Sequence, residues 1–176
     1  MITSLVLTVV GPDKPGLVNS LSDKAAAFGA NWLESRMANL AGQFAGIVHL
    51  HVPSANANPL TAALRELESQ GFRIMITKSI GERAEPSSRV LKLELVGQDR
   101  PGIVRDISRA LAVRGISIEE LGTEVVSGSW SGENLFQAKA KLRVPAAVAT
   151  EELRRILERL ANELMVDLSL EEAPAA

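Results

Sequence analysis

The chain has 176 residues, of which 46% are hydrophobic and 23% charged, and its formal net charge is −2; this is the composition of a folded protein with one medium domain or two small ones. The lack of cysteine excludes disulfides, thiolate metal sites and a cysteine nucleophile, and the lack of a basic stripe argues against direct contact with nucleic acid. No apolar run reaches the roughly 20 residues of a membrane-spanning helix and no secretory signal pattern opens the chain, so we expect a cytoplasmic protein without membrane contact.

The first half of the chain predicts a strand, a helix, two strands, a helix and a strand. Leucine-rich positions alternate over residues 5–10, which is typical of a strand with one buried face. The outward set includes Val6 and Val10, which suggests that a subunit partner covers part of that face. A helical spacing then runs to Gly29, a residue suited to the positive φ that ends many helices. The later elements are two strands closed by Pro53, a helix over 60–67 and a strand over 72–76.

The second half repeats this pattern. Gly11-Pro12-Asp13-Lys14-Pro15-Gly16 returns as Gly97-Gln98-Asp99-Arg100-Pro101-Gly102, and the later strands, helices and glycines follow in the same order. Strand, helix, strand, strand, helix, strand is the ferredoxin-like order. We therefore predict an α+β fold of two tandem ferredoxin-like βαββαβ domains. Each domain is an antiparallel four-stranded sheet with two helices on one face.

The repeat also sets the expected domain organisation. The first domain is expected over residues 1–80 and the second over 89–170. Residues 81–88 have the composition of a linker. Residues 171–176 are expected to form a frayed tail.

The repeated turn between strand and helix suits a small carboxylate. Asp13 and Asp99 are expected to cap the helix N-termini, with Pro15 and Pro101 in the first turn. Gly16 and Gly102 leave room for a group to approach the backbone. Free N–H groups at a helix N-terminus bind anions, so an amino acid is a fitting ligand, and Gly16→Val is expected to block binding without harming the fold. The other reading is that Asp-x-Pro-Gly only begins a helix.

One amide distinguishes the two copies. Asn31 follows Gly29 at the start of the next strand and is expected to reach toward the same turn, where its side chain can both donate and accept hydrogen bonds. The equivalent residue of the second copy is Ser117, which is shorter. We therefore expect the better ligand site in the first copy, unless Asn31 only caps the turn.

These residues resemble the ACT domain family, the small regulatory modules of amino-acid metabolism. The matching segments are Asp13-Lys14-Pro15-Gly16-Leu17-Val18 with Gly29-Ala30-Asn31, and Asp99-Arg100-Pro101-Gly102-Ile103-Val104 with Gly115-Ile116-Ser117. In that family the turn and the next strand form the effector site, often between modules. The resemblance carries this role to Gly16, Leu17, Val18 and Asn31, and to Gly102, Ile103 and Val104. Ser117 departs from the usual Asn.

The resemblance implies a regulator with no DNA-reading element, since the repeat accounts for every expected helix. Such a protein binds a small amino-acid effector, glycine or a similar one, and acts on a partner transcription factor. The effector must favour one conformational or assembly state. We expect a homodimer without a cofactor. The alternatives are an interaction module of amino-acid metabolism that binds no ligand, and an enzyme, which the lack of Cys, Tyr and a recognisable carboxylate pair disfavours.

Two other features are weaker. His49 and His51 share one face of a strand at a spacing that allows metal binding, but their counterparts Lys141 and Arg143 indicate a solvated face, so no metal is expected. Trp32 is expected to pack on the core. Trp130, in the longer hairpin of the second copy, either contacts a partner or covers a core edge.

Overall fold

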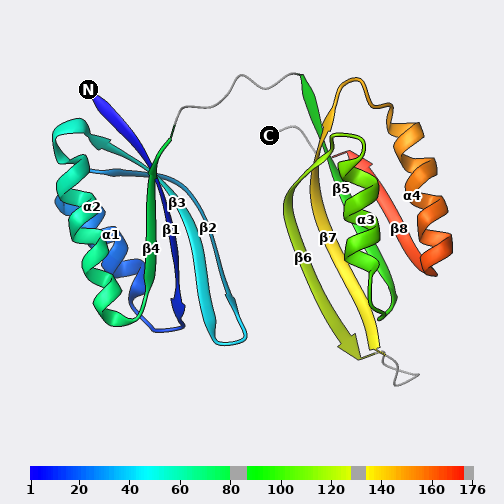
Figure 1. Cartoon of the computed structure of the whole chain (residues 1–176), viewed down its shortest axis with the longest axis horizontal. Helices are drawn as coiled ribbons and strands as arrows, with labels where there is room; N and C mark the ends of the chain where they lie inside the picture. Colours follow the sequence, from blue (N-terminus) through cyan, green and yellow to red (C-terminus); the bar gives the residue numbers. More distant parts are fainter. Residues whose placement is uncertain (80–86, 128–133, 173–176) are drawn as a thin grey trace. The chain divides into compact units, whose positions relative to one another are not determined.

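The computed structural model describes residues 1–79, 87–127 and 134–172. The chain divides into two compact units, Met1–Arg83 and Ala84–Ala176. Each unit has the order strand, helix, strand, strand, helix, strand, with both helices on one side of its sheet (Figure 1). The prediction of an α+β protein with two ferredoxin-like modules is confirmed.

The first unit is built on an antiparallel sheet with the strand order β2-β3-β1-β4. Its strands are β1 (Ile2–Pro12), β2 (Asn31–Leu40), β3 (Gln43–Pro53) and β4 (Arg73–Lys78). Its helices are α1 (Leu17–Ala27) and α2 (Ala57–Arg65), with short 3-10 turns η1 (Ser54–Asn56) and η2 (Glu66–Gln70) on either side of α2.

The second unit has the same topology, with the strand order β6-β7-β5-β8. Its strands are β5 (Ser88–Gln98), β6 (Ser117–Ser127), β7 (Asn134–Pro145) and β8 (Val166–Glu172). Its helices are α3 (Ile103–Ala112) and α4 (Thr150–Leu164). The helix α4 is continuous where the first unit has α2 followed by η2.

Each unit has its own apolar core between sheet and helices. The alternating leucines point inward as predicted, and Leu5, Leu7 and Val9 are at most 2% exposed. They pack under buried residues of the two helices, such as Leu21 and Leu60. The second core repeats this with a leucine set on β5 and the buried faces of α3 and α4: Leu91, Leu93, Leu95, Ile107, Leu111, Leu153 and Leu157.

The first glycine of the repeated motif allows two strands to approach closely. A Cβ on Gly11 would lie 2.3 Å from Cδ1 of Phe72, and a Cβ on Gly97 would lie 2.4 Å from Cγ1 of Val166. Both contacts are buried: Phe72 immediately precedes β4 and Val166 is the first residue of β8. This glycine therefore serves packing in both copies.

The glycines that follow the first helix of each unit end it as predicted. Gly29 and Gly115 have φ values of 67° and 68°. The next backbone N–H groups turn back to the helix, from Ala30 to the carbonyl of Ala25 at 2.9 Å and from Ile116 to that of Leu111 at 3.2 Å. This is the hydrogen-bonding pattern of a glycine-terminated helix.

The outer faces of the two sheets differ in chemistry. On the first sheet Val10, Ile47 and Met75 are 41%, 53% and 61% exposed. On the second sheet the corresponding face carries charged side chains from β5 and β7, namely Lys92, Glu94, Lys139, Lys141 and Arg143. The first unit therefore exposes an apolar patch, flanked by Arg36 and Arg73, on the sheet face opposite its helices.

The minor sequence features are placed as follows. His49 and His51 lie on the outer face, with Nε2 of His49 2.6 Å from Oγ of Ser4. Among the described residues no group of three or more His, Asp or Glu side chains could hold a metal ion. Trp32 is half-buried against the first core, as predicted. Trp130 lies outside the described residues. Within the described part of the chain, no helix is long and apolar enough to cross a membrane.

Candidate functional site: the turn before the first helix

The first helix of each unit, α1 or α3, begins later than the sequence predicts. The N-cap residue is Gly16 in the first unit, with φ 89°, and Gly102 in the second, with φ 99°. Their carbonyls accept the first helical hydrogen bonds, from Ser20 and Asp106, both at 2.9 Å. The prediction that Asp13 and Asp99 cap the helices is therefore wrong, and Pro15 and Pro101 lie before the first helical residue. Because glycine adopts a left-handed conformation, it turns the chain into the helix without a side-chain cap.

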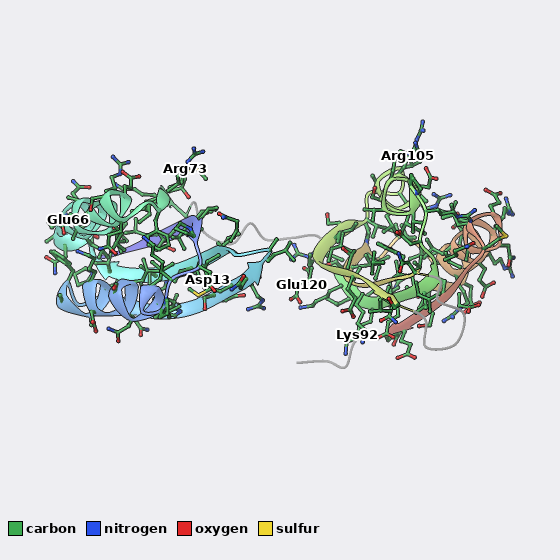
Figure 2. The ribbon with its side chains drawn as sticks, turned by 90° about the horizontal axis from the view of Figure 1, so that it is seen from below. Asp13, Glu66, Arg73, Lys92, Arg105 and Glu120 are labelled. Atoms are coloured by element: carbon green, nitrogen blue, oxygen red, sulfur yellow. The ribbon has the colours of Figure 1, made fainter. Side chains whose placement is uncertain are left out.

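The aspartates instead fix the turn to the neighbouring hairpin. The backbone N–H of Asp13 donates to the carbonyl of Gly42 at 3.1 Å, and the N–H of Asp99 donates to that of Asn134 at 3.0 Å. The carboxylate of Asp13, labelled in Figure 2, also accepts a hydrogen bond from the side-chain amide of Asn39. The turn and the β2–β3 hairpin thus form one structural element.

A basic residue ties the turn to the end of the second helix. Nζ of Lys14 donates to the carbonyl of Gln70 at 3.0 Å, and Nη2 of Arg100 donates to that of Glu163 at 3.3 Å. Cations stabilise the unpaired carbonyls at a helix C-terminus. The residue between Asp and Pro in the motif therefore has a structural role in both copies.

In the first unit the helix N-terminus is free to receive an anion. Helix α1 has no side-chain cap and no acidic residue in its first turn, so its first N–H groups are left without intrahelical partners at the positive end of the helix. A Cβ on Gly16 would meet nothing within 4 Å. The space is open, but φ 89° strains any L-residue. Gly16→Val is therefore expected to strain the turn as well as to fill the open space.

In the second unit α3 has no side-chain cap either, but an ion pair lies beside the same turn. Asp106 lies in the first turn of α3 and accepts a 2.8 Å hydrogen bond from Nε of Arg105. This hydrogen bond, together with the charges of Arg105 and Arg109, lowers the pKa of Asp106. A Cβ on Gly102 would lie 3.1 Å from Arg105 and 3.6 Å from the Asp106 carboxylate. At the position of Ser20 in the first unit, the second unit has Asp106 and its ion pair with Arg105.

The structure does not bring Asn31 to the turn of its own unit. Asn31 is opposite His51 and His51 is opposite Ser4, at the end of β1 remote from Pro12. Ser117 is placed likewise, opposite Arg143. The amide at the turn is Asn39, which sequence reasoning missed. The signal was present, because β1 and β2 both pair antiparallel with β3, so their C-terminal ends lie at the same end of the sheet.

The apolar residues of the motif divide into two kinds. Leu17 and Ile103 are 6% and 3% exposed and belong to the cores, whereas Val18 and Val104 are 45% and 42% exposed. Ile103 and Val104 also line an apolar hollow between α3 and its sheet, beside residues such as Phe136. Of these residues, only the exposed valines are accessible to a ligand at the turn.

Comparison with known proteins places this architecture. The family model of the ACT domain matches residues 3–77, which lie within the first unit. The glycine cleavage system transcriptional repressor of Escherichia coli (strain K12) is 24% identical over 168 residues, covering 91% of this chain and 85% of that protein.

Solved structures show the same fold over both units. A crystal structure of an unknown protein from Galdieria sulphuraria is 31% identical, has a TM-score of 0.88, and is matched over 98% of this chain and 99% of that one. A second crystal structure, of a protein assigned as a glycine cleavage system transcriptional repressor, is 21% identical. Its TM-score is 0.70, and the match covers 97% of each chain. The first unit therefore belongs to the ACT domain family, the second unit repeats its fold, and the whole chain resembles the glycine cleavage system transcriptional repressor.

Proposed function

We propose that this protein is a cytoplasmic, amino-acid-binding regulator of transcription that acts through a partner transcription factor and not as an enzyme. The observation that carries the proposal is the uncapped N-terminus of α1 behind the open backbone of Gly16. The relationship to a transcriptional repressor of the glycine cleavage system supports the regulatory role, with glycine or a similar amino acid as effector.

The chemistry of the first turn fits the two charged groups of an amino acid. Its carboxylate would accept hydrogen bonds from the free N–H groups at the start of α1. Its ammonium would find oxygen acceptors on Asp13 and Asn39, which lie together beside the turn. The ion pair of Arg105 and Asp106 disfavours the same event in the second unit. We therefore propose one effector site per chain, at the first turn.

The apolar outer face of the first sheet supports a homodimer. Val10, Ile47 and Met75 are exposed there, with Arg73 opposite Val10 and Arg36 opposite Ile47 in the register. The apolar patch between these arginines can pair with the same patch of a second copy, whereas the lysines and glutamates of the second sheet favour solvent. Because Asn31 is remote from its own turn, it can join an effector site only from another module.

A thermal-shift screen against the twenty amino acids, followed by calorimetry on the positives, tests the proposal. A ligand at a hundred times its Kd stabilises its target by about 2.7 kcal/mol. We expect glycine or another small amino acid to raise the melting temperature, with a stoichiometry of one per chain. A screen without any shift would instead favour an interaction module that binds no ligand. In that case the motif would have only the structural roles described for Asp13 and Lys14.

A further inference from the structure

The seam between the two helices is closed in the first unit. Nζ of Lys24 on α1 lies 2.8 Å from Oε2 of Glu66, the first residue of η2. Lys24 is half-buried by this arrangement, with its side chain 26% exposed. The ion pair and the lysine stem therefore cover the line along which the helices meet.

The same seam is open in the second unit. The repeat places Ala110 where the first unit has Lys24, and Arg159 where it has Glu66. Ala110 and Arg159 cannot form an ion pair, so nothing equivalent closes the seam. A hollow runs along it between α3 and α4. Its apolar part is formed by side chains of both helices, Val113, Ile156 and Leu160. Val113 is 78% exposed.

The charged rim of this hollow has three arginines and two acidic residues. Arg109 and Arg159 are exposed, and neither forms a hydrogen bond or a close ion pair with any residue in the described ranges. Arg109 has only a longer-range attraction to Asp106. Arg114 is held against the carbonyl of Ala110 at 2.7 Å. In the first unit the positions of Arg109 and Arg159 carry Asp23 and Glu66, so the sign of the charge is reversed.

We propose that the seam of α3 and α4, which we call the helix groove, binds an acidic amphipathic helix of a partner protein. Carboxylates of that helix pair with Arg109 and Arg159, since a guanidinium binds a carboxylate through two parallel hydrogen bonds. Its apolar side chains cover Val113 and Leu160, which is how amphipathic helices dock in grooves.

A protein fits this groove better than a nucleic acid does. Asp106 and Glu163 belong to the same rim and would repel a phosphate backbone, whereas a helix can place basic or neutral residues against them. The inference rests on the proposed function only in that a partner protein exists. The groove is separate from the first turn, because it belongs to the other unit.

The test uses the full chain and a synthetic acidic helix of about 15 residues, long enough to be partly helical. Its glutamates and leucines are spaced four residues apart on adjoining stripes, and a control peptide carries Gln for Glu. We expect the acidic peptide alone to shift the methyl NMR signals of Val113, Ile156 and Leu160. The double variant Ala110→Lys/Arg159→Glu transplants the closing ion pair of the first unit and should weaken binding about tenfold or more.

The matched control is Lys92→Glu, which reverses a charge on the outer sheet face of the same unit. Figure 2 shows Lys92 and Arg105 on opposite sides of that unit. This variant should bind like the unaltered chain, and both variants should keep the far-UV circular dichroism and melting temperature. Equal binding of the Gln peptide would overturn the proposal, and so would unchanged binding by the Ala110→Lys/Arg159→Glu variant. A DNA duplex that shifts these methyl signals where the acidic peptide does not would also overturn it. The thermal response to amino acids should survive closure of the groove, so that failure of either proposal is seen separately.

Discussion

The side-chain amide of Asn39 donates a hydrogen bond to the carboxylate of Asp13, although 26 positions separate them in the chain. The contact exists because β2 and β1 end at the same end of the sheet, where the β2–β3 hairpin meets the turn. The equivalent residue of the second unit is Val125, which lies opposite Phe136 as Asn39 lies opposite Phe44. The two repeated turns thus differ in a side chain that neither motif contains.

Replacement of Asn39 tests whether this pair belongs to the effector site. Asn39→Ala removes an acceptor for the ammonium of a bound amino acid and frees the Asp13 carboxylate. Hydrogen bonds to charged groups contribute about 1.5–3 kcal/mol, so calorimetry should show a loss of roughly tenfold or more in affinity. Val125→Ala is the matched control and should leave the affinity unchanged. Equal effects of the two variants would remove Asn39 from the site.

A reciprocal exchange tests why one turn binds and the other does not. Ser20→Asp places a carboxylate in the first turn of α1, where it interacts favourably with the helix dipole and repels a ligand carboxylate. We expect slightly higher thermal stability without ligand, together with a much smaller shift with ligand. Asp106→Ser should have the opposite effect in the second unit and raise the stoichiometry toward two per chain. If the Ser20→Asp variant binds the amino acid with unchanged affinity, the ligand carboxylate does not bind at the N-terminus of α1.

The apolar face of the first sheet gives a prediction for the oligomeric state. Ile47→Lys introduces a charge in the middle of that face, beside Thr8 of β1, and an unpaired charge at a buried interface is strongly unfavourable. Light scattering after size exclusion should show a dimer for the unaltered chain and a monomer for the variant. The control is Lys139→Glu, at the equivalent position of the second sheet, which should stay dimeric. A monomeric unaltered chain would contradict the prediction.

The sequence was sufficient to predict elements and faces but not contacts between them. The alternation of Leu5 and Leu7 and the glycine after each helix follow from local geometry, and both are confirmed. The N-cap prediction at Asp13 was wrong because an uncapped helix behind a left-handed glycine has no residue signature of its own. The place of Asn31 at the start of β2 keeps it from the turn, whereas Asn39, near the end of β2, lies beside Asp13. Strand direction, a property of the whole sheet, determines which end of β2 meets the turn.

The packing role of the first motif glycine leads to the last prediction. Gly97→Ala would bring a methyl group within 2.9 Å of the backbone Cα of Val166, so the strands must separate. Overpacking of this kind costs about 1–3 kcal/mol, and urea denaturation should show that loss for Gly97→Ala and a similar one for Gly11→Ala. Gly122 on β6 is the control, because a Cβ there meets nothing within 4 Å. Gly122→Ala should be neutral or stabilising by up to about 1 kcal/mol, since alanine loses less backbone entropy on folding. Equal stability of Gly97→Ala and Gly122→Ala would show that β5 and β8 can move apart freely, and the glycine would then need another explanation.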